Sequence, residues 1–277
     1  MIETLVDGLG FVEGLRRHDG RTWFSDFSAR RVYSFGGYNV LRTEAYVPGQ
    51  PSGLGFAPAG GVLVVSVHEG RILRYENSSC TLIADIGAIY RGGLNDMLTT
   101  AAGQSYVSAF PAPPVGDVIA DVPADGGQVP LFFVSAKGEA RVVAEGLKIP
   151  NGIAQSVDGR ELFVAETMAR RILVFSILPD GSLSNQRTFA DLGHRMPDGL
   201  SMDRQGRLWF GSPFSSEFVR LDTSGAIDEI VPTPGRWAVS CAVGDNDDEL
   251  YCGTVRTTIE DYKQGQASGS IERWSRG

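Results

Sequence analysis

Short runs of apolar residues, broken by Gly and Asp, follow one another along the whole chain. Each run spans four to six residues, and clear examples are residues 22–26, 62–66, 162–166 and 208–211. A run of this length, alternating or fully apolar and bounded by Gly or Asp, is typical of a β-strand, and no helical period separates the runs. The pattern therefore predicts an all-β protein.

The apolar runs belong to a unit that repeats six times. Each copy has a first strand, a turn that ends in Gly, a second apolar strand and a third strand rich in Arg with Val or Ile; the copies start near residues 12, 51, 94, 150, 197 and 239. Six such sheets around an axis form a six-bladed β-propeller, whereas a sandwich or an open barrel predicts no period that lasts from end to end. We predict a single propeller domain over residues 1–277, in which residues 3–6 complete the last blade and close the ring.

Two segments between the strands stand out. Pro-Asn-Gly at 150–152 and Pro-Asp-Gly at 197–199 start the fourth and fifth copies, and these residue types predict tight turns. Residues 109–130 interrupt the third copy with an insertion rich in Pro and Gly. Long propeller loops often bind ligands or cover a site, and a surface loop without such a role is the alternative.

Charge and cysteine content narrow the class of partner. The net charge of −8 and the scattered arginines argue against nucleic acid and against a membrane surface, and they favour a small molecule. Neither a basic start before an apolar core nor an apolar stretch of ~20 residues is present, which predicts a cytoplasmic protein. Cys80, Cys241 and Cys252 are too few for a disulfide framework and are expected to be reduced. The oligomeric state stays open.

In a propeller the first strand of each blade lines the central channel, so the repeat brings equivalent residues to one height. Aligned on the turn of each copy, these positions are Glu13, Ser52, Asn95, Asn151, Asp198 and Val239. Four of them offer carboxylate or amide oxygens, and such ligands without His or Cys suit a hard divalent cation. We predict a metal site in the channel formed by Glu13, Asn95, Asn151 and Asp198, with Ca²⁺ as the first candidate and Zn²⁺, Mn²⁺ or Mg²⁺ as alternatives. The competing interpretation makes Asn and Asp here turn residues only.

The same residues fall in motifs of a known family. The markers are "VEG" at 12–14, "NDM" at 95–97, "PNGIA" at 150–154, "PDGLSMDRQGRLWFG" at 197–211 and "GRWAVSCAVG" at 235–244. With these motifs spread over nearly its full length, the chain resembles the SMP-30/gluconolactonase/LRE-like superfamily of calcium-dependent six-bladed propellers. The resemblance implies that Glu13, Asn151 and Asp198 bind the metal and that Asn95 is either a fourth ligand or a substrate contact.

The resemblance also implies an activity, the hydrolysis of a lactone, often of a sugar acid. The metal would polarise the carbonyl, and Asp198 would take the proton of the attacking water or act as a nucleophile. Gly93 stands where many family members have an Arg that holds substrate hydroxyls, so the nearby Arg91, together with His68 and Asn95, is a candidate substrate contact. Two other functions stay open: phosphotriester or aryl-ester hydrolysis at the same site, and a non-enzymatic propeller with a structural metal.

Overall fold

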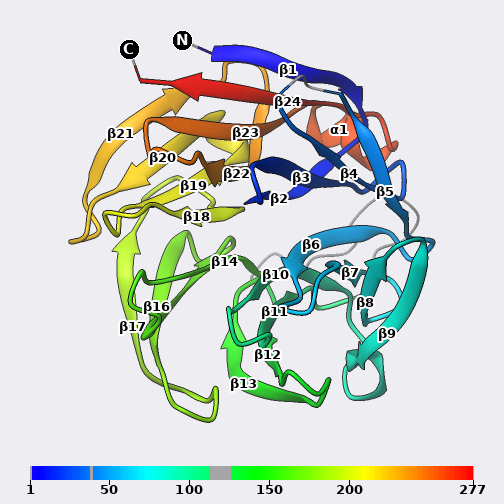
Figure 1. Ribbon diagram of the computed structural model, residues 1–277. Helices are drawn as coiled ribbons and strands as arrows, with labels where there is room; N and C mark the ends of the chain where they lie inside the picture. The colour runs from blue at the N-terminus through cyan, green and yellow to red at the C-terminus, as the bar shows by residue number, and fades with distance from the viewer. Residues whose placement is uncertain (1, 38–39, 113–125, 277) are drawn as a thin grey trace.

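The computed structural model describes residues 2–37, 40–112 and 126–276, and in them twenty-four strands form six four-stranded sheets. The sheets stand around a central axis like blades, which confirms the predicted six-bladed β-propeller (Figure 1). Most of the insertion at 109–130 falls in residues 113–125 and so lies outside the described residues. No helix in the described part of the chain is long and apolar enough to cross a membrane.

The strands of the first five blades follow chain order from the axis outward. The first blade consists of β2 (Val12–His18), β3 (Arg21–Asp26), β4 (Arg31–Phe35) and β5 (Arg42–Tyr46). The second consists of β6 (Pro51–Phe56), β7 (Val62–Ser66), β8 (Arg71–Glu76) and β9 (Ser79–Asp85). The third consists of β10 (Leu94–Thr99), β11 (Ser105–Ala109), β12 (Val129–Val134) and β13 (Ala140–Leu147).

The remaining blades and the short helices complete the ring. The fourth blade consists of β14 (Pro150–Gln155), β15 (Glu161–Glu166), β16 (Arg171–Ile177) and β17 (Leu183–Asp191). The fifth consists of β18 (Leu200–Met202), β19 (Leu208–Ser212), β20 (Glu217–Leu221) and β21 (Ile227–Pro232). The last consists of β22 (Trp237–Val243), β23 (Glu249–Arg256), β24 (Ser268–Ser275) and β1 (Ile2–Leu9). The helical turns are η1 (Ile86–Ala88), η2 (Pro213–Ser215) and α1 (Ile259–Lys263).

The ends of the chain close the ring by pairing in one sheet. Strands β1 and β24 run antiparallel, with Glu3 opposite Arg273, and the Arg273 guanidinium lies 2.7 Å from the Glu3 carboxylate. Figure 1 shows the blue and red strands side by side. This confirms the prediction for residues 3–6, and hydrogen bonds between the first and last strands of the chain close the ring.

The apolar core lies between neighbouring blades rather than at the axis. Val32 of the first blade clusters with Val62 and Leu73 of the second, and Trp209 of the fifth blade, 2% exposed, clusters with Cys252 of the sixth. Each sheet is therefore stabilised by the two blades beside it, as burial of apolar side chains requires.

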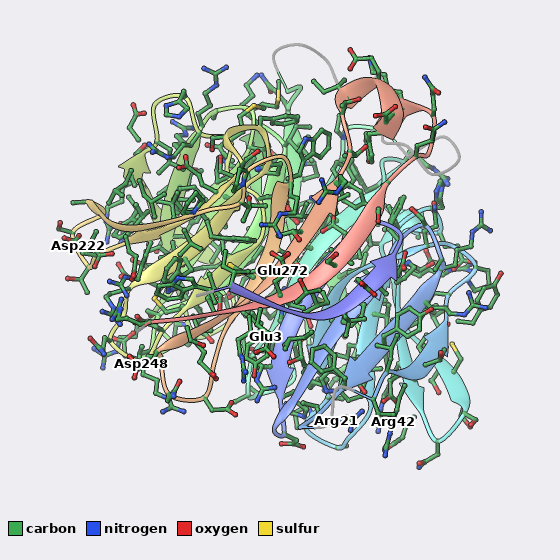
Figure 2. All side chains as sticks on the ribbon, turned by 90° about the horizontal axis from the view of Figure 1, so that it is seen from above. Glu3, Arg21, Arg42, Asp222, Asp248 and Glu272 are labelled. Carbon is green, nitrogen blue, oxygen red and sulfur yellow. The ribbon has the colours of Figure 1, made fainter. Side chains whose placement is uncertain are left out.

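Charged side chains mostly project from the rim of the molecule. Figure 2 shows Arg42 and Asp248 pointing outward, whereas Glu272 lies close against β24. Glu272 is 2% exposed and forms an ion pair with Arg236. Several buried carboxylates pair with an arginine in this way, among them Glu166 with Arg171 and Asp203 with Arg207, whereas the buried Asp26 accepts hydrogen bonds from the backbone N–H groups of Gly10 and Ala29.

The outermost strands of the first five blades are missing from the predicted repeat unit. In β9, for example, only Ala84 is buried, and the remaining residues are exposed or partly exposed. Such a strand covers the sheet edge with one face in solvent, so its sequence lacks the apolar run that identified the inner strands.

Candidate metal and active site

The predicted ring residues lie at irregular points of the innermost strands. The pairing with the second strand shifts register between Glu13 and Arg16, Pro51 and Leu54, Leu94 and Met97, Pro150 and Ile153, and Ala238 and Ser240. A β-bulge of this kind leaves a residue unpaired and re-aims its side chain. The fifth blade has no such shift in register. Asp198 lies outside the paired register there because it precedes β18, which begins at Leu200.

The glycines beside the ring residues allow neighbouring inner strands to touch. A Cβ atom on Gly152 would lie 2.4 Å from the carbonyl oxygen of Asp198, and one on Gly199 would lie 2.9 Å from the Cα of Ser240. Neither glycine has a positive φ, and Gly152 lies within β14. The predicted tight turn at 150–152 is therefore wrong. Close approach of two backbones, rather than turn conformation, excludes a side chain at these two positions.

The contacts among the ring residues join adjacent blades. The Asn151 side chain donates a hydrogen bond to the carboxylate of Asp198, and the Asn95 Nδ2 donates to the carbonyl oxygen of Pro150 at 3.4 Å. Ser52, Asn95 and Asp198 are 2%, 1% and 8% exposed, so the site is largely removed from solvent. Val239 contributes no polar side chain; its carbonyl accepts from the Gly199 N–H at 2.9 Å.

Two polar atoms of the ring have no hydrogen-bond partner among the described residues. They are the Oδ1 of Asp198 and the Oγ of Ser52, both buried. A buried oxygen without a partner costs about 1–3 kcal/mol, and more when it is charged. Such atoms mark a position at which a ligand of opposite charge, or a donor, is expected.

The electrostatics of the axis lead to the same expectation. Burial raises the pKa of Asp198 to about 8, repulsion from Asp96 adds to the rise, and the hydrogen bond from Asn151 opposes it. Burial also raises the pKa of Glu13 well above its usual value, and Asp198 and Asp96 add to that effect. Two carboxylates in this position are ionised together at neutral pH only if a cation offsets their repulsion.

A third carboxylate, Asp96, was not predicted from the sequence. Its Oδ1 lies 2.6 Å from the Nη2 of Arg16, and that nitrogen also donates to the carbonyl oxygen of Met97 at 2.7 Å. In the repeat, Asp96 takes the position that Gly152 and Gly199 hold in later blades. A charged residue in a column of glycines was the sequence signal that could have identified it.

The donors at the axis fit a hard divalent cation. The set combines the carboxylates of Glu13 and Asp198 with the amides of Asn95 and Asn151, and oxygen ligands of this type suit Ca²⁺ or Mg²⁺ better than softer metals. No group of three or more His, Cys, Asp and Glu side chains gathers as a metal site anywhere in the described residues. Any ion on this axis would therefore depend on the two amides as well as on the two acids.

An aromatic collar surrounds the narrow pocket above these donors. It consists of Phe11, Phe27, Phe110 and Tyr262, and the same pocket is lined by Glu13, Ser52 and Asn95. None of the four was a predicted site residue. Tyr262 belongs to α1, in a connection that the repeat does not contain, and single aromatic residues give no sequence signal that separates a pocket wall from core.

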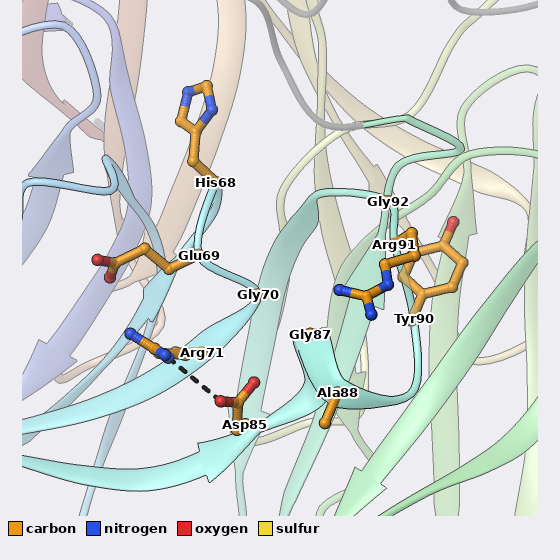
Figure 3. Close-up of a pocket in the computed structure, with 10 residues that line it drawn as sticks. All are labelled: His68, Glu69, Gly70, Arg71, Asp85, Gly87, Ala88, Tyr90, Arg91 and Gly92. Atoms are coloured by element: carbon orange, nitrogen blue, oxygen red, sulfur yellow. Dashed lines mark hydrogen bonds and ion pairs between the residues drawn. The ribbon is translucent and has the colours of Figure 1, made fainter.

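His68 and Arg91 lie apart from this narrow pocket. They line a neighbouring cavity of ≈ 290 Å³ between the second and third blades, which also contains the Arg71–Asp85 ion pair at 3.4 Å (Figure 3). The Nε2 of His68 contacts the side-chain oxygen of Gln50. The structure thus brings together Glu13, Asn95, Asn151 and Asp198 and leaves the other two candidates in an adjacent hollow.

The fold and the axial residues define a class: a six-bladed β-propeller with a buried oxygen-donor site at the end of its central channel. The sequence profile of the SMP-30/Gluconolactonase/LRE-like region matches residues 11–256. The chain belongs to this family.

Individual relatives are distant but extend over much of the chain. Regucalcin from Sus scrofa is 21% identical over 243 residues, which is 86% of this chain and 80% of the relative. L-arabinolactonase from Azospirillum brasilense is 31% identical over 115 residues, 41% of this chain and 38% of the relative.

Two solved structures share the fold. The gluconolactonase from Xanthomonas campestris superimposes with a TM-score of 0.79 at 20% identity, covering 99% of this chain and 88% of its own. Regucalcin from Agrobacterium tumefaciens, described as a calcium-binding protein, gives 0.79 at 18% identity and covers 100% and 95%.

Proposed function

We propose that this protein is a divalent-cation-dependent hydrolase that opens the ring of a lactone. The observation that carries the proposal is the convergence at the axis of Glu13, which is half-buried, and Asp198, which is buried, with an oxygen of Asp198 left without a partner among the described residues. Family membership supports the reaction class, since relatives of the chain include an L-arabinolactonase and a gluconolactonase.

Glu13, Asn95, Asn151 and Asp198 would hold the cation, and Ca²⁺ is the first candidate because all four offer oxygen. When bound, the cation supplies a Lewis acid that draws electron density from the carbonyl group of the lactone. The regucalcin from Agrobacterium, which shares the fold, is described as a calcium-binding protein, and this supports the choice of ion.

Asp198 is the proposed general base. Asn151 donates a hydrogen bond to this carboxylate, and Oδ1, which has no hydrogen-bond partner among the described residues, is the oxygen proposed to accept the proton of an attacking water. The low exposure of Asp198 keeps bulk water from competing for that oxygen.

Asn95 is the proposed inner substrate contact because it shares the narrow pocket with Glu13 and Ser52. His68 and Arg91 stay predictions for the outer part of a substrate, since the cavity that they line lies next to this pocket.

The test is a pH-indicator screen of sugar, aliphatic and aromatic lactones with Ca²⁺, Mg²⁺, Mn²⁺ or Zn²⁺, beside an aryl phosphotriester. We expect lactone hydrolysis that stops on chelation while the circular dichroism spectrum persists. Asp198→Asn should lower kcat by at least ~100-fold, the usual contribution of a general base. The exposed-loop change Asp222→Asn is the matched control.

Equal turnover in Asp198→Asn and the parent would contradict the proposed base. Faster hydrolysis of the phosphotriester than of any lactone would make the protein a phosphotriester hydrolase instead. Unfolding on chelation, without hydrolysis of any substrate, would favour a structural ion.

A further inference from the structure

This inference rests on the proposed lactone hydrolysis and concerns its substrate class. We propose that the aromatic collar selects lactones with apolar substituents over polyhydroxylated sugar lactones, and that Tyr262 is the residue that sets this preference. The inference comes from the composition, the rigidity and the small opening of the pocket above the axial donors.

The collar forms a mainly apolar wall around the entrance to the axial site. Phe11, Phe27 and Phe110 are 8%, 4% and 5% exposed, and the polar residues among the described pocket lining are Glu13, Ser52 and Asn95. Those three belong to the ring below. Within the described lining of this pocket, a substituent that projects from the lactone toward solvent therefore meets aromatic rings, of which only Tyr262 carries a hydroxyl.

The inner part of the collar is held in place through its backbone. The Phe27 N–H donates to the Phe11 carbonyl at 2.8 Å, and the Phe110 N–H donates to the Gly93 carbonyl at 2.8 Å. The Tyr90 hydroxyl donates to the Phe110 carbonyl at 2.6 Å. With their main chains bonded and their side chains at most 8% exposed, these phenylalanines have little room to move aside for a polar group.

Tyr262 forms the outer part of the collar and is less buried than the three phenylalanines. Its ring lies 5.1 Å from that of Phe11 and 5.7 Å from that of Trp237, measured between centroids. It belongs to α1, in which no residue is buried. Although its ring packs against the core cluster that contains Phe11, Tyr262 is the one member of the collar that is not buried.

The pocket is too small to admit a substrate as it stands. Its free volume of ≈ 10 Å³ is room for about one water molecule. A lactone ring can enter only if Tyr262 moves outward, and the ring then lies between Tyr262 and the fixed phenylalanines. Apolar substituents gain burial and aromatic contact there, while each hydroxyl without a partner loses hydrogen bonds to water.

The size of the effect follows from this contrast. A hydroxyl added to a group in an apolar pocket lowers kcat/KM by up to ~100-fold. For two δ-lactones of equal ring size, we expect δ-hexalactone to be hydrolysed with a kcat/KM at least ~100-fold above that of D-glucono-1,5-lactone.

The decisive variant is Tyr262→Ser, which removes the outer aromatic ring from a half-buried surface position. It should lower the ratio of the two kcat/KM values about tenfold by admitting the sugar lactone. Phe214→Ser is the matched control, because Phe214 also contacts Trp237, at 5.0 Å, but does not line the pocket. The control should keep the parent ratio.

A parent enzyme that prefers D-glucono-1,5-lactone would overturn this inference and leave the lactonase proposal intact, as would equal effects of Tyr262→Ser and Phe214→Ser. If neither lactone is hydrolysed, the lactonase proposal fails, and the collar is tested by binding. Trp237 fluorescence should then report tighter binding of δ-valerolactam than of D-gluconolactam. The reverse order, or no binding of either lactam, overturns the inference.

Discussion

Arg16 on the first blade reaches Asp96 on the third, with 2.6 Å between the guanidinium Nη2 and the carboxylate Oδ1, and so passes the inner end of the second blade. The side chains are 17% and 5% exposed. This pair lies directly beside the candidate metal donors, since Asp96 follows Asn95. It links two blades that are not neighbours and fixes one wall of the channel.

Replacing Arg16 with Met should destabilise the protein by about 3 kcal/mol, because the change leaves a buried carboxylate without its cation. Urea unfolding measures the loss, and the double variant R16M/D96N should recover part of it. Arg187→Met is the control: Arg187 pairs with Glu161 at 2.6 Å, but the two side chains are 55% and 37% exposed. An exposed pair of this kind is worth less than about 1 kcal/mol. Equal losses for the two single variants would contradict a special role for the Arg16 pair.

Gly152→Ala should cost about 3 kcal/mol and should also reduce turnover. The new Cβ would lie 2.4 Å from the carbonyl oxygen of Asp198 and 2.4 Å from the amide nitrogen of Leu200, so one of the two inner strands must shift. Gly37→Ala is the control, since a Cβ there meets nothing within 4 Å and the backbone does not require glycine. Thermal unfolding and kcat are measured on both variants. Similar stability of Gly152→Ala and Gly37→Ala would contradict the prediction and show that the inner strands can separate at little cost.

Cation binding should matter more for stability as the pH rises. Without a cation, burial raises the pKa of Asp198 to about 8 from its ordinary value of 3.8, and the pKa of Glu13 is raised as well. Between those values the native state binds more protons than the unfolded state, so the free energy of unfolding falls with pH, by up to about 1.4 kcal/mol per pH unit for each such group.

Bound Ca²⁺ favours the ionised carboxylates and offsets that loss. The Tm of Ca²⁺-loaded protein should therefore exceed that of chelated protein by a wider margin at pH 8 than at pH 5, as measured by differential scanning fluorimetry. The same margin at both pH values, or a wider one at pH 5, would contradict the proposed role of the two acids. D198N should reduce the pH dependence of the chelated protein.

The repeat made the fold and the position of the axial residues predictable. Glu13, Asn95 and Asn151 appear in register because the same bulged strand recurs, and Asp198 takes the equivalent position just before β18, so each faces the channel whatever the length of the loops between blades. Their role as ligands stays a prediction. The turn predicted at 150–152 was wrong because Gly152 is required by the close backbone of the next blade rather than by a turn. A contact between blades cannot be recognised from the local sequence.

The collar and the Arg16–Asp96 pair could not be predicted in the same way. Each depends on contacts between segments far apart in the chain, such as Phe11 with Tyr262. Tyr262 lies in a connection that occurs in one blade only, so the repeat gives it no equivalent. Asp96 could have been noticed in the sequence as a charged residue at a position that is glycine in other copies. Nothing in the sequence indicated that its partner is Arg16 on another blade.

The pairing of β1 with β24 also has a consequence for synthesis on the ribosome. The partner of Glu3 is Arg273, so β1 emerges about 270 residues before the strand that completes its sheet. At typical rates of translation this delay is on the order of 10 to 50 s. During that time β1 presents an unpaired edge, and the nascent protein is open to misassociation until β24 has been made. Chaperone dependence should therefore extend over the whole interval between the synthesis of β1 and that of β24.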